Sequence, residues 1–476
     1  AGLTRRILVV TPSNLLSNWH AEFGKWLGGT PHELNVSVLK KTTAHLSVTE
    51  RLNLLVRSRA PRHNITLISY EGLERHGRHL CTGEGLDLLV ADEAHALGHT
   101  GVRQRALRAT PARARLLITA APLSNDLSEL FQLYDLARPG ILGTAAHFQI
   151  DFARPIEGAS AVDATESAKA VGTAAMDVLN DISYEVKLGR KSDVLLRGLP
   201  RKHTLMVMCR PTEPQRRLVE LLQPVASGAA LQALSLIRTA LLDPEELIST
   251  AYGARKLRHV FEHSPERPSE QMAWSGKLQT CVRLVDAILR QRVLDNDKVV
   301  VVGDRLNVLR RIRSYVVSEH GTGLDVTLTG ETDVDERMPA ITRFNDPTSS
   351  LRVCFLIKQL AVGINLIGAN HLILLEPAYN PAADKQAMER IHREGQTKEC
   401  YIYRLACTGS IDETVLERQT RKGGLLDMLD RKPPKLPPAH SPDRDLLFKL
   451  DGPNIASRLY ERLPTDSPYA DMSVWV

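Results

Sequence analysis

The sequence has few cysteines, and none of them is spaced as a zinc site or a redox pair. No C-x-x-C occurs, and no Cys and His residues stand at the spacing of zinc ligands. This usage is typical of a protein in a reducing compartment. The six cysteines are Cys81, Cys209, Cys281, Cys354, Cys400 and Cys407.

Long apolar runs are also lacking. No run approaches the roughly 18 residues that a membrane span needs, and the first residues show no signal-peptide pattern of basic start and apolar stretch. We therefore expect a soluble protein without a membrane partner.

A large charge excess is missing too. The 61 Lys and Arg residues face 55 Asp and Glu residues, a net charge of +6, which permits a polyanionic partner but does not require one.

What the sequence does have is length and alternation. Its 476 residues are 43% hydrophobic, enough for about two to four domains. Short apolar runs alternate with amphipathic stretches, which predicts β-α-β units, parallel sheets and an α/β fold. The expected strands lie at 5–12, 65–70, 86–93 and 114–121 in a first part, and at 297–304, 324–330, 351–358, 371–377 and 400–407 in a second.

The stretch between these parts has Ala-rich and Leu-rich helical spacing, with a polar segment punctuated by prolines. Near its end the chain carries RKPPKLPPAH, which predicts a stiff extended linker. A docking site for an SH3-type partner is the alternative. We therefore predict a first α/β lobe at 1–156, helical insertions and a linker at 157–274, a second α/β lobe at 275–422 and a tail at 423–476.

One expected strand ends in two adjacent carboxylates. In LDLLVADEAH, the strand closes with Asp92 and Glu93, and a parallel sheet presents such side chains at its carboxyl edge, where α/β folds bind ligands. In phosphoryl transfer, the first acid would hold Mg²⁺ and the second would orient or deprotonate the attacking water. A polar helix start is the alternative for an isolated acidic pair.

Other short stretches accompany this pair in a characteristic order. They are 8–27, 68–73, 116–143, 275–278, 363–381 and 386–405. Together they resemble the superfamily-two helicase-like ATPases of the SWI/SNF type, over nearly the whole chain. Within that family, 189–202, 365–413 and 415–419 most resemble the recombination-repair translocases of the Rad-fifty-four branch.

The resemblance implies two RecA-like lobes with ATP and Mg²⁺ in the cleft, double-stranded DNA across both lobes, and translocation driven by opening and closing of the cleft. It also implies a nuclear protein of homologous recombination or chromatin remodelling, with a recombinase filament or nucleosomes as partners. Among the residues, it implies Asp92 as the Mg²⁺ ligand, Glu93 and His95 as catalytic residues, and Gly363 and Gln386 as nucleotide contacts.

Two arginines in QAMERIHREGQ resemble the arginine fingers of the family. Arg390 and Arg393 lie three residues apart, so on a helix they share one face. A guanidinium fork suits phosphate better than a lysine does. Gln386, Gly395 and Gln396 around them strengthen the resemblance, which implies a catalytic role for Gln396 as well. A solvated basic helix face is the alternative.

DNA contacts in this family come from loops at the ends of strands. Backbone amides and small hydroxyls there grip phosphates without reading bases. The matching positions are Thr11, Pro12, Asn18, Ser69, Tyr70, Lys358 and Asn365. Trp19 matches as well, but its helical spacing with Phe23 and Trp26 favours a place in the core over a base-stacking platform.

The phosphate-binding loop of such an ATPase is missing from the 476 residues. No Gly-rich turn ending in Lys and Ser or Thr is present, and the SGKL at 275–278 stands where the family uses it for packing. Because the chain begins at Ala1, almost directly in a strand, we expect an amino-terminal truncation. Such a truncation would leave negligible ATP turnover and expose the edge of the first sheet.

Two further family motifs are altered. Ala120 and Ala121 stand where the family has Gly and Thr, and Ser124 stands where it has Gln. Small and polar positions of another motif are replaced by Leu356, Ile357, Gln359, Leu360 and Ala361. Two hypotheses follow: an ATP-driven DNA translocase, of this branch or of another SWI/SNF branch, or a non-catalytic DNA- or partner-binding scaffold with a degenerate motor.

Overall fold

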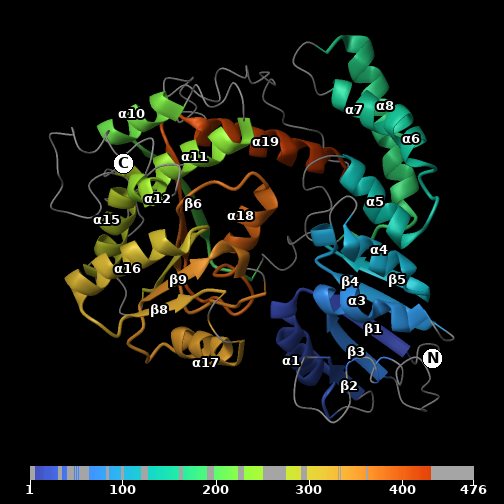
Figure 1. The fold of residues 1–476 in the computed structure, drawn as a ribbon, viewed down its shortest axis with the longest axis horizontal. Coiled ribbons are helices and arrows are strands. Elements are labelled where there is room, and N and C mark those ends of the chain that lie inside the picture. Colours follow the sequence, from blue (N-terminus) through green and yellow to red (C-terminus); the bar gives the residue numbers. More distant parts are fainter. Residues whose placement is uncertain are drawn as a thin grey trace. The chain divides into compact units, whose positions relative to one another are not determined.

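The structure is a computed structural model with two compact units. They are Ala1–Arg190 with Gly424–Ala439, and Lys191–Gly423 with His440–Val476. Each unit has its own parallel sheet and its own core (Figure 1). The described residues are 6–29, 35–39, 48, 50, 52, 64–81, 85–97, 101–119, 127–159, 164–189, 198–222, 230–249, 275–290, 297–330, 332, 334–360 and 363–429.

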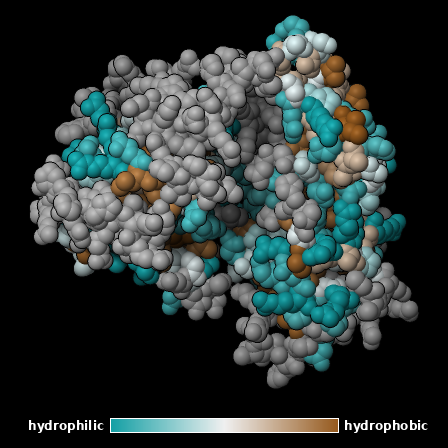
Figure 2. All heavy atoms as spheres, turned by 45° about the horizontal axis from the view of Figure 1, so that its top comes forward, coloured by the Kyte–Doolittle hydropathy of each residue, from teal (hydrophilic) through white to brown (hydrophobic). Residues whose placement is uncertain are grey.

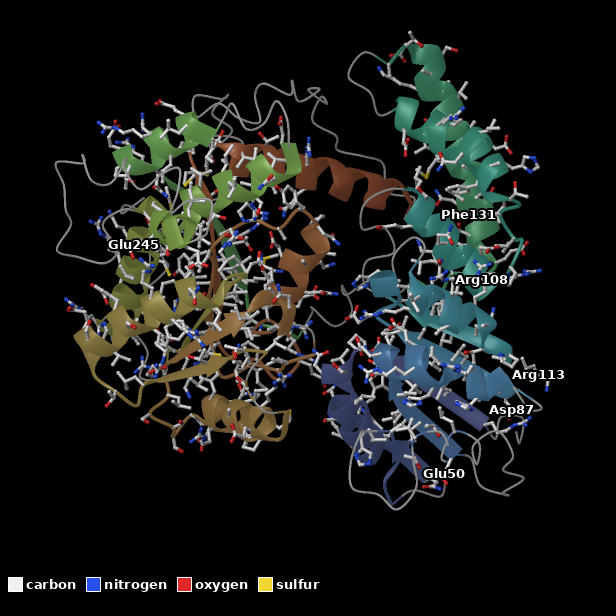
Figure 3. The ribbon with its side chains drawn as sticks, viewed as in Figure 1. Glu50, Asp87, Arg108, Arg113, Phe131 and Glu245 are labelled. Atoms are coloured by element: carbon white, nitrogen blue, oxygen red, sulfur yellow. The ribbon has the colours of Figure 1, made fainter. Side chains whose placement is uncertain are left out.

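The first unit is built on a parallel sheet with the strand order β2-β3-β1-β4-β5. Its strands are β1 (Arg6–Thr11), β2 (Asn35–Val38), β3 (Asn64–Ser69), β4 (Leu86–Asp92) and β5 (Ala112–Ile118). β1 lies between β3 and β4, with Ile7 opposite both Ile65 and Leu88. At the amino ends of β1 and β4, Asp87 accepts a hydrogen bond from the Arg6 N–H at 2.9 Å (Figure 3).

Helices surround this sheet and extend from it. Around it lie α1 (Leu16–Leu27), α3 (Tyr70–His76), α4 (Val102–Ala109) and α5 (Leu127–Ala137), with the short η1 (Ser13–Leu15), η2 (Gly77–Cys81) and η3 (Ala94–Leu97). The extension consists of α6 (Ala145–Phe148), η4 (Gln149–Ala153), α7 (Arg154–Ala159) and α8 (Glu166–Tyr184). Phe131 on α5 connects them, because its ring centroid lies 5.2 Å from that of Phe148 (Figure 3). Figure 2 shows apolar atoms on the surface of the extension, where Val171 and Val178 are 54% and 51% exposed.

The second unit contains a parallel sheet with the order β6-β11-β10-β7-β9-β8. Its strands are β6 (Lys202–Cys209), β7 (Val299–Gly303), β8 (Asp325–Leu328), β9 (Val353–Ile357), β10 (His371–Leu374) and β11 (Cys400–Cys407). Its helices are α10 (Glu213–Leu222), α11 (Ala230–Leu242), α12 (Pro244–Ser249), α15 (Gly276–Arg290), α16 (Leu306–His320), α17 (Val334–Asn345), η6 (Lys358–Leu360), α18 (Pro381–Met388) and α19 (Ile411–Leu429). Every residue of β7, β9 and β10 is buried, as expected for parallel strands that are covered on both faces.

The predicted α/β class and all nine predicted strands are confirmed. Two strands were missed, β2 and β6. β6 corrects the interpretation of 157–274 as helical insertions, because it pairs with β11 along eight residues and so belongs to the second sheet. Its partner lies almost 200 residues further along the chain, and no local pattern in a Leu-rich and Ala-rich surrounding reveals such a pairing. The boundary between the two units accordingly falls after Arg190.

β5 lies at one edge of the first sheet. Among the described strands it pairs with β4 alone, and its Leu116 and Ile118 are 49% and 38% exposed. In the described part of the chain, this edge and one face of β5 are therefore open.

The remaining general expectations concern membranes, thiols and the tail. In the described ranges, no helix is long and apolar enough to cross a membrane. The cysteines Cys209, Cys281, Cys354, Cys400 and Cys407 are free and buried. The Pro-rich segment 431–440 lies outside the described residues.

Candidate nucleotide and DNA site

Three strands of the first sheet end at the same edge, and each brings a polar side chain there. Thr11 at the end of β1 lies opposite Ser69 at the end of β3, and β4 ends with Asp92. Because the strands are parallel, their carboxyl ends meet at one edge, where ligands bind in open α/β folds. The pairing of β4 with β1 from Leu88 to Ala91 fixes where the Asp92 carboxylate emerges.

Three donors hold the Asp92 carboxylate. Trp19 Nε1 donates to Oδ2 at 2.7 Å, and Thr11 Oγ1 donates to the same oxygen at 3.3 Å. The Glu93 N–H donates to Oδ1 at 2.9 Å. Because the donors come from α1, β1 and the chain after β4, the carboxylate has one defined orientation. A metal ligand needs such support from surrounding groups.

Tyr70 supports Asp92 through the backbone. Its hydroxyl donates to the Asp92 carbonyl at 2.7 Å, and the residue is 1% exposed. Burial, helped by the charges of Asp92 and Glu93, raises the pKa of the Tyr70 hydroxyl far above its usual value, so the hydroxyl remains a donor at neutral pH. Ser69 Oγ accepts from the Gly72 N–H at 3.1 Å and caps α3. Both predicted DNA contacts are thus engaged within the fold.

Glu93 combines an unusual backbone conformation with a hydrogen-bonded side chain. Its φ of 51° is the one positive value at a non-glycine residue in the described ranges, and this conformation costs an L-residue about 1–2 kcal/mol. Glu93 Oε2 lies 3.3 Å from His95 Nδ1, which also lies 3.0 Å from Thr119 Oγ1. Burial lowers the pKa of His95 against the opposing charges of Glu129 and Asp92. A neutral imidazole therefore faces the Glu93 carboxylate.

The donor set of Asp92 fits a magnesium ion. An ionised carboxylate has about four lone-pair sites, and the protein donors to Asp92 occupy three of them, which leaves one on Oδ1. Mg²⁺ commonly takes one or two carboxylates and completes its shell with water and substrate phosphates. Across the described residues there is no group of three or more His, Cys, Asp or Glu side chains that could hold a metal ion. An ion at Asp92 would therefore take most of its ligands from water or phosphate.

The remaining predicted contacts of the first unit lie at the start of α1. Pro12 is half-buried and Asn18 is exposed. Trp19 packs on Phe23 with a centroid distance of 5.5 Å, as expected for a core residue, whereas Trp26 is 66% exposed. The indole N–H of Trp19 reaches Asp92, a contact that helical spacing did not predict.

In the second unit, Lys358 lies at the carboxyl edge of the sheet but is surrounded by acids. Its side chain is 8% exposed, and Nζ lies 3.3 Å from Asp384 Oδ1 and 3.8 Å from Asp304 Oδ2. The same Nζ donates to the Glu376 carbonyl at 3.1 Å. A DNA phosphate would have to compete with two carboxylates for this ammonium group.

Asp384 on α18 is a buried residue with a structural role in the second unit, and sequence reasoning missed it. It is 1% exposed and accepts from the Ala378 N–H at 3.2 Å, from Arg404 at 3.2 Å and from Gln419 at 2.9 Å. It thereby joins α18 to β11 and α19. Its only sequence signal is an acid shortly after YNP, because its partners come from distant segments.

The two predicted arginine fingers do not lie on one helical face. α18 ends at Met388, and turns and bends follow up to Gly395. The Arg390 carbonyl accepts from the Leu366 N–H at 3.0 Å instead of continuing the helix. Arg390 Nε donates to the Gln386 carbonyl at 2.9 Å, whereas Arg393 is exposed. The helical argument was therefore wrong, and Arg393 presents the more accessible guanidinium.

Gln396 is buried, and its side-chain amide is hydrogen-bonded to backbone groups of two segments, its own loop and the segment before β10. Its Nε2 donates to the carbonyls of Ile367, Ala369 and Ile391, and its Oε1 accepts from the N–H groups of Thr397 and Lys398. Both polar atoms of the amide thus have protein partners. The arrangement points to a structural role for Gln396 and leaves no group of it directed at a nucleotide.

The other positions predicted in the second unit differ in what they offer a ligand. Gly363 has a φ of 80°, a conformation that favours glycine, and Gln386 is 9% exposed. The Asn365 carbonyl accepts from Asn345 Nδ2 at 2.8 Å. Among the predicted DNA contacts, Asn365 is the one with a buried polar atom, Oδ1, that lacks a hydrogen-bond partner in the described structure.

The SGKL stretch serves packing, as predicted. Ser275 Oγ accepts from the Leu278 N–H at 3.2 Å and caps α15. Lys277 forms an ion pair with Asp412, and both side chains are 1% exposed. A β-carbon on Gly276 would clash with the carbonyl oxygen of Arg210. These contacts fix the start of α15 beside the end of β6.

Two residues of the altered motif, Leu356 and Ile357, are part of the core of the second unit. Leu356 and Ile357 in β9 are 0% and 7% exposed, so the apolar replacements pack inside. Gln359 is exposed and Leu360 is partly buried. The other altered positions, Ala120, Ala121, Ser124 and Ala361, lie outside the described residues.

Comparisons with known proteins show the family to which the chain belongs. The family described as SNF2-related domain matches residues 1–263, and the family described as Helicase conserved C-terminal domain matches residues 277–395. The DNA repair and recombination protein RAD54-like of Danio rerio is 33% identical over 446 residues, covering 88% of this chain and 58% of that protein. The human protein of the same description is 32% identical over 445 residues, covering 88% of this chain and 57% of its own length.

Two further comparisons come from a plant and an archaeon. Protein CHROMATIN REMODELING 25 of Arabidopsis thaliana is 31% identical over 460 residues, covering 90% of this chain and 49% of that protein. The chain thus spans about half to three fifths of the length of these relatives. A solved structure, the Sulfolobus solfataricus SWI2/SNF2 ATPase core in complex with dsDNA, aligns with 23% identity and a TM-score of 0.36, covering 87% of this chain and 80% of that chain.

Proposed function

The chain belongs to the SNF2-related domain family, and from this premise we propose that it carries the motor core of an ATP-dependent translocase on double-stranded DNA. The observation that carries the proposal is the Asp92 carboxylate, fixed by three donors at the carboxyl edge of a parallel sheet. The relatives named for DNA repair and recombination support homologous recombination as the setting. The relative named for chromatin remodelling supports that process as the alternative setting.

The proposed chemistry divides between two neighbouring acids. Asp92 would hold Mg²⁺, with Oδ1 as the oxygen that keeps a lone pair for it, and the ion would supply positive charge against the triphosphate. Glu93 orients the attacking water or accepts its proton. In the tautomer with its proton on Nδ1, neutral His95 would donate to Glu93 Oε2, 3.3 Å away, and would orient that carboxylate without neutralising it; in the other tautomer, Nδ1 would accept from Thr119 Oγ1.

We assign Arg393 to the γ-phosphate of ATP, with Arg390 beside it and with Gln386 and Gly363 as further nucleotide contacts. The exposed guanidinium of Arg393 supports this assignment, as does the helicase-family match through residue 395. A guanidinium is always charged and binds phosphate oxygens in a fork. We leave Gln396 out of the catalytic set because its amide is fully engaged in its loop.

The proposed DNA contacts are Pro12, Asn18 and Asn365, together with backbone groups of Ser69; Thr11 is left out because it is fully buried. Asn18 is exposed, and Asn365 Oδ1 lacks a partner in the described structure. The side chains of Tyr70 and Lys358 are already bound inside the fold. We expect the chain to bind duplex DNA weakly, without sequence preference, and less well as salt rises.

We further propose that the protein acts in the nucleus, with a recombinase filament or nucleosomes as its partner. The relatives' names support both partners. The 476 residues contain no Gly-rich turn followed by Lys and Ser or Thr, so we propose that this polypeptide alone hydrolyses ATP at a negligible rate.

A non-catalytic scaffold that binds DNA or a partner is the second candidate. It is favoured by Leu356 and Ile357, whose side chains fill the core where the family has small or polar residues. It is favoured also by Lys358, whose charge is balanced by Asp384 and Asp304. Both candidates bind DNA, so hydrolysis distinguishes them.

The test is duplex-stimulated ATP hydrolysis in a chimera that supplies the strand and phosphate-binding loop of a relative ahead of residue 1. We expect duplex DNA to stimulate hydrolysis. Glu93→Gln should lower the stimulated rate by a factor of about 10²–10⁴, the usual effect of losing a general base, without changing duplex binding. Glu22→Gln on α1 is the matched control and should leave the rate unchanged.

Two results would contradict the proposal. A folded chimera that binds duplex DNA but shows no stimulation would refute the motor and support the scaffold. Rapid hydrolysis by the 476-residue chain itself, abolished by Glu93→Gln, would refute the proposed dependence on a supplied phosphate-binding loop.

A further inference from the structure

Trp19 combines an apolar ring with a polar contact that no packing requirement explains. Its ring packs on Phe23 and joins the cluster that contains Val9, Ile65 and Val90 on one side of the first sheet. Its Nε1 donates to Asp92 Oδ2 at 2.7 Å. A phenylalanine would keep a smaller aromatic ring in this cluster but has no N–H group, so the hydrogen bond to Asp92 requires the indole.

The direction of this hydrogen bond limits what Trp19 can do. An indole N–H is a donor only and does not titrate in the physiological range. It binds Oδ2, which also accepts from Thr11 Oγ1 at 3.3 Å. Within the described residues, Oδ1 accepts one hydrogen bond, from the Glu93 N–H. Trp19 therefore occupies Oδ2 and leaves a lone pair on Oδ1 without a protein donor among the described residues.

We propose that Trp19 is a positioning residue for the metal ligand: its indole N–H fixes the Asp92 carboxylate so that Oδ1 meets a divalent cation in one orientation. The inference rests on the proposed function, in which Asp92 binds Mg²⁺. Groups that orient a metal ligand commonly change metal affinity about 10- to 100-fold when they are lost. The metal site is then built jointly by β4 and α1.

The same helix contains a matched control. Trp26 Nε1 donates to Glu22 Oε2 at 2.8 Å, and Trp26 is 66% exposed. Trp19 and Trp26 thus both pair an indole with a carboxylate, but only the first pair stands at the end of β4. Replacing either tryptophan by phenylalanine removes one such N–H and keeps an aromatic ring.

The test measures binding of Mn²⁺, a probe for the Mg²⁺ site, to the full 476-residue chain from the electron paramagnetic resonance signal of the free ion. We expect Trp19→Phe to weaken Mn²⁺ binding about 10-fold and Trp26→Phe to leave it unchanged. Asp92→Asn should remove the site. Tb³⁺ emission excited through tryptophan gives a second readout of the site in chains that keep Trp19: Asp92→Asn should abolish it and Trp26→Phe should not.

The outcomes separate this inference from the proposed function. If Asp92→Asn binds Mn²⁺ like the unchanged chain, the metal role of Asp92 in the proposed function fails. If Asp92→Asn loses the site while Trp19→Phe binds as tightly as Trp26→Phe, the role of Asp92 stands and the positioning role of Trp19 is overturned.

Thr11→Val covers the case in which Trp19→Phe also unfolds at a lower temperature. The substitution is close in shape and removes the other donor to Oδ2. Thr11 is fully buried, so the loss acts on the carboxylate and not on a surface contact. Positioning predicts weaker Mn²⁺ binding by Thr11→Val, whereas unchanged binding would refute it.

Discussion

Lys277→Met should destabilise the second unit strongly, because it leaves the Asp412 carboxylate buried without its cation. Both side chains are 1% exposed. Burial is the largest single influence and disfavours the charged form of Lys277, but the charge and hydrogen bond of Asp412, together with the charges of Cys407 and Glu376, outweigh it and raise the pKa of the ammonium group. In the variant, the donor that remains to that carboxylate among the described residues is the Cys407 N–H at 2.9 Å.

The expected magnitude follows from the burial of both partners. Removing one member of a fully buried ion pair costs about 3–5 kcal/mol, mainly because the other charge is left uncompensated. For a domain of about 200 residues, that loss lowers the melting temperature by roughly 10 °C. Methionine keeps most of the volume of the lysine stem, so little of the loss comes from a cavity.

The assay is urea unfolding of a double-mutant cycle. Asp412→Asn keeps an acceptor for the Cys407 N–H and removes the charge. The double variant should therefore be about 2 kcal/mol more stable than the sum of the two single losses predicts. If the single losses add, or if Lys277→Met costs less than about 1 kcal/mol, the reasoning from an uncompensated charge is refuted.

Three further predictions concern stability. Gly276→Ala should cost about 1–3 kcal/mol in urea unfolding because its β-carbon would clash with backbone. Gly158→Ala in α7 meets nothing within 4 Å and should stabilise by up to about 1 kcal/mol, because alanine is the better helix former; equal effects would refute the clash. Burial, against the opposing charge of Asp297, lowers the pKa of His371 below its usual 6.5. Its contribution to stability is therefore present above pH 6.5 and is lost as pH falls below it, by up to about 1.4 kcal/mol per pH unit. His371→Gln should flatten that slope, measured as unfolding free energy between about pH 7.5 and 5.5, and an unchanged slope would contradict it. Glu93→Gly should stabilise the first unit by about 1 kcal/mol because glycine tolerates the φ of 51°, and Glu93→Gln, which keeps the strain, should give no such gain in melting temperature.

The sequence predicts the elements that depend on local patterns. A buried parallel strand needs only a short apolar run between turn signals, so β4, β7 and β10 were predicted from residues within each strand. β6 contains such a run too, LMVMC at 205–209, but it stands between Leu-rich and Ala-rich helical stretches and was interpreted as part of them. The end of α18 was misjudged because the Arg390 carbonyl pairs with Leu366, a contact that no neighbouring residue indicates.

Charged positions were harder to predict than apolar ones. Asp92 was found because it follows a strand and marks the edge of a sheet. Lys358 follows a strand too, yet it binds Asp384 and Asp304. The chemical type of a side chain limits what it can bind. Whether the Lys358 ammonium group binds a phosphate or a carboxylate depends on which helix packs over it, here α18 with Asp384.

The contacts of Asp384 and Lys277 set the smallest part of the second unit that can fold by itself. The family match at 277–395 omits β6 and β11, two of the six strands of the sheet. It also omits Asp412 and Gln419, which satisfy Lys277 and Asp384 in the interior. An expression fragment that ends before Asp412 would leave Lys277 buried without its carboxylate, and one that begins after β6 would leave β11 without its paired strand on that side. The autonomous folding unit therefore extends from before 202 to beyond 419, about twice the matched length.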